Sequence, residues 1–402
     1  MREILKKLIF FLLVIVAAAF SVTAQASQSI VNRASPVIIG VPLPLSGSLK
    51  AFGIMMKNSF EMARESVNEN GGIKGRPLKT VYADDQGKAS LGGKIIKSLV
   101  NDSRAVMLTG GYASNPTYNM AKTAERMDVP FLICTASADK ITQKGWKNIY
   151  RLNPPISEYT KGLEDFLIKS YKPKSMAVIY ENSMFGTGGA MRMMEFCRDN
   201  AIEVVSLIPY DKAKASQAYF RPLIAPLTAE FPDVIYMISY LHDAVTLVRE
   251  IRDLKIKSLL CGGAGGFTLE EFITNAGAAA NHLLTATLWS GHLTYPGARQ
   301  YYDQYKGRYA SPPDYHGAEA YSALLVAADA LKRAESLDPK SIRTALNETF
   351  MITPFGPIKF HSYYDFERQN STRTQVLQVI DRKFETIWPL EFATKKFVPS
   401  IK

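Results

Sequence analysis

Short β-branched runs alternate with amphipathic segments along most of this 402-residue chain, and this alternation restricts its fold more than any other feature. The first four runs are brief, continuous and apolar, as strands of a parallel sheet buried on both faces must be. They span residues 37–41, 78–82, 105–109 and 129–133. Met56, Phe60, Ala63 and Val67 lie on one face of a helix between the first two runs. The order is therefore strand, helix, strand, helix.

The pattern restarts after Pro154-Pro155. New strands are predicted at 176–180, 203–208, 234–238 and 258–261, with helices near 157–171, 186–200, 216–229 and 241–254. A further strand at 283–288, helices near 317–335 and 341–349, and a β-rich tail with 376–380 complete the chain. Two similar α/β units are expected. Because ligands in open α/β sheets lie beyond the carboxyl ends of the strands, two such sheets that face each other form a binding cleft.

The N-terminal segment, residues 1–26, has the pattern of a cleaved secretory signal. A positively charged start precedes an apolar run over 8–20, and small residues at a peptidase spacing end at Ala26. The apolar run is shorter than the roughly 20 residues that span a bilayer. No cysteine follows the signal to take a lipid, since the first is Cys134. The mature protein is predicted to be periplasmic, without a lipid anchor.

Composition excludes several classes of protein. A hydrophobic fraction of 47% is enough for real cores, and the formal net charge of +11 is spread among acidic residues. Because no basic stripe with interleaved aromatics occurs, a nucleic-acid partner is not expected. Cys134, Cys197 and Cys261 cannot all pair within the chain, so one disulfide is the maximum.

Enzyme motifs are absent from the sequence or incomplete. Neither a nucleophile-elbow motif nor a zinc-protease motif occurs, and the five histidines have no metal-ligand spacing. The run at 186–189 lacks the third glycine of a dinucleotide loop, and the stretch 87–94 has Gly93 at the position where a P-loop has its lysine. Asp84 and Asp85 fit a cap or hinge contact better than a catalytic pair. We therefore expect no enzyme activity, no catalytic residue, no metal and no cofactor.

Several motifs carry a resemblance to a known family. They are Pro44-Leu45-Ser46-Gly47, the highly specific run Asn-Glu-Asn-Gly-Gly-Ile-Lys-Gly-Arg-Pro-Leu at 68–78, Asp84-Asp85-Gln86, 110–114, Ala136-Ser137, Phe185-Gly186, Tyr240 and Ala320-Tyr321. The chain resembles the type I periplasmic binding proteins of the branched-chain amino-acid ABC transporter class, the leucine-binding-protein-like family. The likeness covers nearly all of the mature chain.

The resemblance implies an α/β fold of two Rossmann-like lobes, each with a central parallel sheet, joined by a three-strand hinge. Lobe 1 is expected to hold residues 36–154 plus 288–355, and lobe 2 residues 155–287 plus 356–402. The crossings would then lie near Pro154, Thr287 and Phe355.

The resemblance also implies a ligand site between the lobes. The positions that match the family's site are Phe52, Tyr112, Ala113, Ser114, Ala136, Ser137 and His316 in the first lobe, and Phe185, Tyr240 and Ala264 in the second. Ser114 or Asn115 can also cap a helix that begins at Pro116, whose free N–H groups suit a carboxylate. An ordinary helix cap, a plain turn or simple aromatic packing would leave the same patterns.

Ala264 departs from the family pattern. Amino-acid binders of the family place an acidic residue there to pair with the ligand ammonium. Unless Asp243 or Glu319 replaces that acid, a buried ammonium would be unpaired, at a cost of several kcal/mol. Without such a replacement, a carboxylate, amide or aromatic acid is favoured over a free amino acid.

The expected function is the solute-binding component of an ABC importer, which captures a small organic ligand by hinge closure and delivers it to a membrane permease and ATPase. The protein is expected to act as a monomer. An exported sensor that presents its closed lobes to a receptor or regulator is the alternative, and an enzyme on this fold ranks third.

Overall fold

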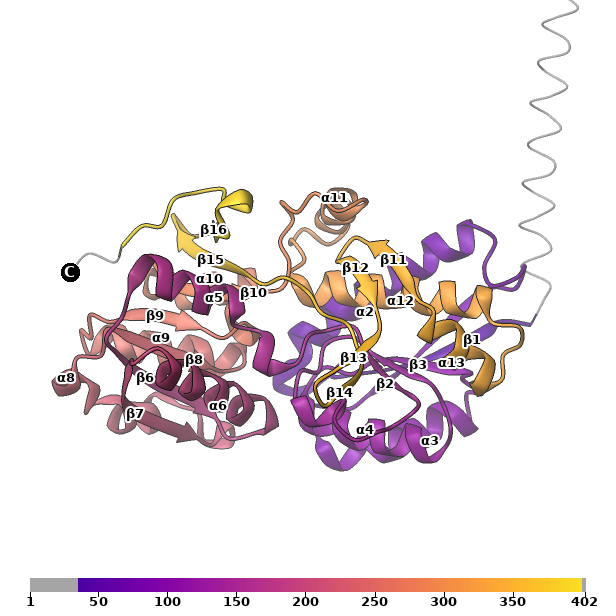
Figure 1. Cartoon of the computed structure of the whole chain (residues 1–402), viewed down its shortest axis with the longest axis horizontal. Helices are drawn as coiled ribbons and strands as arrows, with labels where there is room; N and C mark the ends of the chain where they lie inside the picture. Colours follow the sequence, from indigo (N-terminus) through magenta and orange to yellow (C-terminus); the bar gives the residue numbers. More distant parts are fainter. Residues whose placement is uncertain (1–34, 400–402) are drawn as a thin grey trace, which may run out of the picture.

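The computed structural model describes residues 35–399 and shows two α/β lobes side by side (Figure 1). The predicted signal, residues 1–26, lies outside the described part of the chain. Each lobe is built on a seven-stranded sheet, which confirms the expected fold class. Helices lie on both faces of each sheet, as the buried apolar strands require.

The first sheet has the order β13-β14-β5-β4-β3-β1-β2. Its strands are β1 (Val37–Leu43), β2 (Leu78–Asp84), β3 (Met107–Gly110), β4 (Phe131–Ile133), β5 (Ile149–Arg151), β13 (His361–Tyr363) and β14 (Phe366–Gln369). Strands β1 to β5 and β14 run parallel, and β13 is an antiparallel edge strand beside β14. Their carboxyl ends therefore meet at one edge of the sheet, beside the second lobe.

The second sheet has the order β16-β15-β10-β9-β8-β6-β7. Its strands are β6 (Ser175–Glu181), β7 (Glu203–Tyr210), β8 (Val234–Ile238), β9 (Leu259–Gly262), β10 (Leu284–Thr287), β15 (Gln375–Ile380) and β16 (Lys383–Trp388). Strands β6, β7, β8, β9 and β10 are parallel, and β15 and β16 add an antiparallel edge beside β10. The part of the predicted β-rich tail that contains 376–380 thus extends this sheet.

The helices cover the two sheets separately. The first lobe carries α2 (Lys50–Glu69), α3 (Gly92–Asn101), α4 (Ser114–Arg126), α12 (Tyr315–Arg333) and α13 (Pro339–Asn347). The second carries α5 (Lys161–Phe166), α6 (Met184–Asp199), α7 (Gln217–Ile224), α8 (Leu227–Glu230), α9 (Leu241–Asp253) and α10 (Glu270–Ala276). Helix α11 (Ala298–Tyr309) follows the segment that returns to the first lobe. The long apolar faces of α2 and α12 pack on each other.

The expected third crossing near Phe355 is wrong. Strand β12 (Gly356–Lys359) pairs with β11 (Phe350–Thr353), and β14 joins the first sheet through the pairing of Gln369 with Arg151. The Gln369 side chain is fully buried there: its Oε1 accepts from Arg151 Nε at 2.6 Å, and its Nε2 donates to the Asn153 carbonyl at 2.6 Å. Residues 356–369 therefore belong with the first lobe, and the chain crosses again only before β15.

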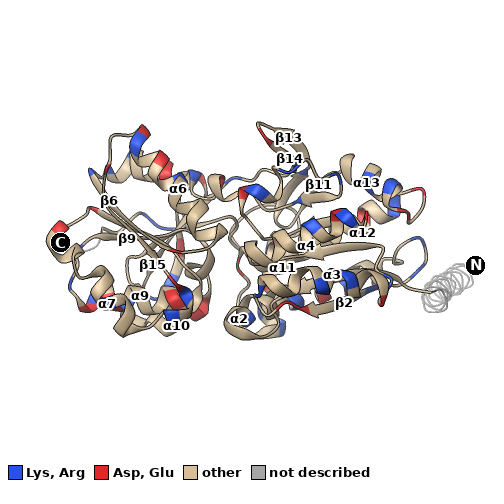
Figure 2. Cartoon of the chain, turned by 90° about the horizontal axis from the view of Figure 1, so that it is seen from below, with Lys and Arg blue, Asp and Glu red and all other residues tan. Residues whose placement is uncertain are grey.

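The described surface carries a mixture of charges. Figure 2 shows basic and acidic positions together on the helices of both lobes. This distribution fits the expectation of a diffuse basic excess rather than a stripe. The three cysteines are free and buried. None of the helices described between residues 35 and 399 is apolar over a length that could cross a membrane.

Candidate functional site

A small cavity lies where the carboxyl ends of the strands of both lobes meet. Its volume is about 20 Å³, which is space for about one water molecule. It is lined by Tyr112, Ser114, Thr135, Ser137, Tyr159, Phe185, Tyr240, Gly265, Tyr315 and His316. The lining comes from loops that follow β3 and β4 and from the start of α12 in one lobe, and from loops that follow β6, β8 and β9 in the other, so both lobes contribute to the cavity.

Six of the ten residues predicted for the site line this cavity, namely Tyr112, Ser114, Ser137, Phe185, Tyr240 and His316. The other four lie around it. Phe52 stacks behind Tyr112, Ala136 is buried between two lining residues, and Ala264 directly precedes the lining residue Gly265. Ala113 lines a neighbouring crevice of about 220 Å³, which Tyr240 separates from the cavity. The structure therefore brings six of the predicted residues together in one cavity wall, and the other four lie outside that wall.

Aromatic rings form a continuous series across the lobe boundary. Phe52 and Tyr112 stack in the first lobe with ring centroids 4.7 Å apart and planes at 19°. Tyr112 meets Tyr240 of the second lobe at 5.9 Å, and Tyr240 meets Phe185 at 5.4 Å. Such offset and tilted pairs each stabilise by about 0.5–1.5 kcal/mol beyond the burial of their area. The two lobes therefore meet through apolar rings rather than through ion pairs at this point.

The loop after β3 differs from the expected cap. Helix α4 begins at Ser114, and the N-cap residue is Ala113, which has no side-chain oxygen to give. The Ser114 hydroxyl instead accepts from the Ala138 N–H at 3.1 Å and ties this loop to the one after β4. The predicted capping by Ser114 or Asn115 is therefore wrong. Asn115 Oδ1 accepts from the Met184 N–H of the second lobe at 3.1 Å.

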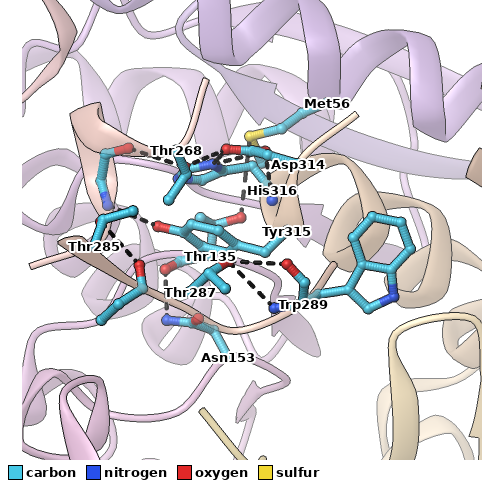
Figure 3. A network of polar contacts seen from close by, with 12 residues as sticks. Met56, Thr135, Asn153, Thr268, Thr285, Thr287, Trp289, Asp314, Tyr315 and His316 are labelled. Carbon is cyan, nitrogen blue, oxygen red and sulfur yellow. Dashed lines mark hydrogen bonds and ion pairs between the residues drawn. The ribbon is translucent and has the colours of Figure 1, made fainter. Parts of the chain in front are cut away.

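Asp314 connects the cavity with the second lobe (Figure 3). Its carboxylate caps α12 by accepting from the His316 N–H at 2.9 Å, and it accepts from the His316 ring Nδ1 at 2.8 Å. The Thr268 hydroxyl of the second lobe donates to the same carboxylate at 2.6 Å. Next to it, the Tyr315 hydroxyl accepts from the Gly265 N–H at 3.1 Å. The start of α12 thus both presents two lining rings and holds the lobes together.

Four lining residues were not predicted from the sequence: Thr135, Tyr159, Gly265 and Tyr315. Tyr159 follows the first crossing, and its hydroxyl donates to Asn153 Oδ1 at 2.8 Å. Tyr315 directly precedes the predicted His316, and Gly265 follows Ala264, so adjacency to a predicted residue is the signal that could have found both. Gly265 has a φ of 57°, a conformation that glycine adopts without strain.

Burial dominates the electrostatics around the cavity. It raises the pKa of Tyr112 and of Tyr240 well above the ordinary range of a phenol, so both are neutral donors. Burial, with the charge of Glu181, also raises the pKa of Asp243 to about 7, although its Oδ2 accepts from the Tyr210 hydroxyl at 3.2 Å. Burial and then the charge of Asp314 raise the pKa of Glu319 well above its usual value.

Asp84 and Asp85 act on the backbone, as expected from the sequence. Asp84 Oδ1 accepts from the Leu45 N–H at 2.8 Å and from the Ser46 N–H at 3.2 Å, which orders the loop before α2. Asp85 Oδ1 accepts from the Gly87 N–H at 2.7 Å. Within residues 35–399 no group of histidine, cysteine and acidic side chains is arranged to hold a metal ion. The site offers hydroxyls, backbone N–H groups and aromatic faces, which are means of binding.

The sequence matches curated proteins along almost its whole length. It is 24% identical over 392 residues to the Leu/Ile/Val-binding protein homolog 7 of Brucella melitensis, covering 93% of this chain and 95% of that one. It is 25% identical over 393 residues to the homolog 8 of Brucella suis, again covering 93% of this chain and 95% of the relative.

Solved structures show the same fold. The branched-chain amino acid transporter substrate binding protein LivJ from Streptococcus pneumoniae, solved with isoleucine, superposes with a TM-score of 0.80 at 22% identity, covering 88% of this chain and all of that one. A solute binding protein of an ABC transporter from R. palustris, solved with benzoate, gives 0.78 at 18% identity, covering 88% and 96%. The family model described as periplasmic binding protein matches residues 36–383. This chain therefore belongs to the periplasmic binding protein family, whose members bind solutes for transport rather than catalyse reactions.

Proposed function

We propose that this protein is the solute-binding component of an ABC importer and that its two lobes close on a small organic ligand. The observation that carries the proposal is the cavity at the strand ends, whose lining comes from both lobes. Because a small organic ligand needs more room than the ~20 Å³ found here, the lobes must part to admit it, and in the closed form it contacts both lobes at once. It therefore favours the closed form by its differential affinity for the two forms.

The cross-lobe contacts support hinge closure as the mechanism. Three hydrogen bonds join the lobes beside the cavity, from Thr268 to Asp314, from Gly265 to Tyr315 and from Met184 to Asn115. Each is a short polar contact at a loop, which water can replace when the lobes part. Each seven-stranded sheet lies within one lobe, so a rotation of the lobes about the crossings would break neither sheet.

The chemistry of the cavity fits a carboxylate, an amide or an amino-acid-like molecule. Ser114 and Ser137 offer hydroxyls at the first lobe, and the start of α4 offers free N–H groups. The aromatic rings suit an apolar or flat body. The similar proteins cover the same range of ligands. The curated relatives are named for binding Leu, Ile and Val, one solved structure holds isoleucine, and another holds benzoate.

The proposal requires a membrane permease and an ATPase as partners. It also requires that the predicted signal directs export to the periplasm, and we propose that the binding protein acts there as a monomer. A sensor is the second candidate, because the same closed pair of lobes can be recognised by a receptor instead of a permease. A permease and ATPase encoded beside this chain favour import, and a kinase or regulator favours sensing.

A thermal-shift panel tests the proposal. Amino acids, amides and aliphatic or aromatic carboxylates are added one at a time, and a true ligand raises the melting temperature by mass action. The bound compound is then recovered by denaturing the protein and identified by mass spectrometry. The proposal is supported if a compound binds and is recovered chemically unchanged. It is contradicted if the bound compound is converted to another, or if no compound of the panel binds.

A further inference from the structure

We propose that the ligand carries a positively charged nitrogen and that Glu319 supplies the counter-charge for it from the first-lobe side of the cavity. The inference rests on the proposed function and names the chemical class of its ligand. Ala264 has no carboxylate to offer such a nitrogen, so another acid must supply the counter-charge.

Glu319 lies one helical turn after two residues of the cavity wall. Residues three and four positions apart share a face of an α-helix, so Glu319 lies on the same face of α12 as Tyr315 and His316. Its side chain is completely buried, and neither carboxylate oxygen has a hydrogen-bond partner. Buried polar groups are nearly always paired in folded proteins. An unpaired carboxyl behind a binding cavity therefore points to a group that the ligand brings.

The surroundings of Glu319 hold it neutral until such a group arrives. Asp314 on the same helix is the charge that acts on it, and Cys134, Tyr159 and Tyr315 are the titratable neighbours that feel its own charge. The Thr135 hydroxyl acts against this shift and lowers the pKa of Glu319, but the hydrogen bonds that it makes go to Cys134 Sγ at 3.3 Å and Met56 Sδ at 4.0 Å.

The helix packed along α12 adds no charge to this environment. The buried side chains of α2 include Phe52, Met56 and Phe60, none of which titrates. No lysine or arginine contributes to the raised pKa of Glu319. A cation from the ligand would be the first positive charge to face this carboxyl.

The wall of the cavity also favours a cation. None of its described lining residues is a lysine or an arginine, and the acids Glu181, Asp243 and Asp314 raise the pKa values of the tyrosines around it. Lys212 lies outside Tyr240, where its ammonium is 3.5 Å from Glu181 Oε1 and 5.4 Å from the centre of the Tyr240 ring. Aromatic faces attract cations, most strongly where water is excluded. A ring of tyrosines in a negative field is therefore a site for an alkylammonium group.

Asp243, the other acid that could replace the missing one, is already engaged. Its Oδ2 accepts from the Tyr210 hydroxyl at 3.2 Å, and Asp243 is not among the residues that line the cavity. Glu319 differs because both of its oxygens are free to accept. When an ammonium enters, the neutral carboxyl of Glu319 loses its proton to solvent and becomes the carboxylate partner of the cation. Binding of a cation should then release up to about one proton per site.

Matched pairs of probes test the inference by calorimetry. Glycine betaine is compared with 3,3-dimethylbutanoate, and leucine with 4-methylpentanoate, because each pair shares its carboxylate and shape but only the first member carries the charged nitrogen. We expect at least one nitrogen compound to bind ten-fold or more tightly than its partner. Titrations in buffers of different ionisation enthalpy should show the proton release.

The isosteric variant Glu319→Gln should lose most of that preference while binding the nitrogen-free acids as before, and Glu335→Gln, an exposed change just beyond the same helix, should change nothing. The inference is overturned if the nitrogen-free acids bind as tightly as their partners, or if Glu319→Gln keeps the preference. Binding of amides or carboxylates alone would overturn it and leave the proposed function standing, whereas no binding by any compound of the wider panel would overturn both.

Discussion

The Thr268 hydroxyl of the second lobe donates a hydrogen bond of 2.6 Å to Asp314 of the first, and the same carboxylate holds the His316 ring at 2.8 Å. One side chain thus shapes the cavity wall and fastens the lobes. The proposed closure would therefore be coupled to formation of the site, because the carboxylate that accepts from Thr268 also holds the His316 ring in the cavity wall.

Removing that contact should weaken ligand binding without harming either lobe. Thr268→Val keeps the shape of the side chain but loses the donor, and a hydrogen bond to a charged group contributes about 1.5–3 kcal/mol. We expect the dissociation constant to rise about ten-fold or more in a titration, with the melting temperature of the free protein nearly unchanged. The control is Thr274→Val, an exposed threonine on α10. Equal affinity in both variants would remove Thr268 from the closure mechanism.

Tyr240 should contribute through its ring rather than its hydroxyl. The ring packs against Tyr112 and Phe185, and among residues 35–399 its hydroxyl makes no hydrogen bond. Tyr240→Ala should therefore weaken ligand binding by about 2 kcal/mol or more, as removal of buried aromatic area does. Tyr240→Phe should bind nearly as well as the natural protein. If Tyr240→Ala binds normally by calorimetry and stays folded by circular dichroism, Tyr240 is not part of the site.

Asp243 should make the protein less stable as the pH rises. Its pKa is about 7 in the folded protein because of burial, against about 3.9 in an unfolded chain. The folded state therefore binds the proton more tightly, and this group costs up to about 1.4 kcal/mol of stability per pH unit between pH 4 and 7. Asp243→Asn keeps an acceptor for Tyr210 and should flatten the fall in urea-unfolding free energy over that window. Asp253→Asn, at the exposed end of the same helix, should leave it as it was.

Two glycines should respond in opposite ways to alanine. A Cβ on Gly53 of α2 would lie 1.9 Å from the Pro44 carbonyl oxygen, whereas one on Gly307 of α11 would meet no atom within 4 Å. Gly53→Ala must move the loop beside Phe52 and should destabilise the protein by roughly 1–3 kcal/mol. Gly307→Ala should be neutral or stabilise it by up to about 1 kcal/mol, since alanine favours the helix. Equal melting temperatures for the two variants would contradict the close packing of α2 on the β1 loop.

The sequence predicted the parts of the fold that hydrophobic periodicity controls. Strands such as β1 and β8 are continuous apolar runs, and the face of α9 repeats at a helical period, so their placement follows from local pattern. The assignment of β14 to the first sheet could not be predicted in this way, because it depends on the buried pair of Arg151 and Gln369, which are 218 residues apart. Polar pairs at such separation leave no periodic signal.

Of the residues that line the cavity, the sequence predicted only those that belong to recognisable motifs. Tyr240 lies two residues after the end of β8 and Ser137 four residues after the end of β4, so sheet topology brings both to the strand ends. Tyr159 and Thr135 reach it through the hydrogen bonds around Asn153, which set the path of the chain at the first crossing. The role of Asp314 depends on Thr268 in the other lobe, and no pattern within α12 reports that contact.

Small-angle X-ray scattering with and without a saturating ligand tests the central claim most directly. We expect the ligand found in the panel to lower the radius of gyration, because a ligand in the cavity would hold both lobes through Ser114 and Tyr240. Thr268→Val should need more ligand to reach the same compact form. A ligand that binds tightly while the radius of gyration stays constant would contradict closure of two hinged lobes around a captured solute.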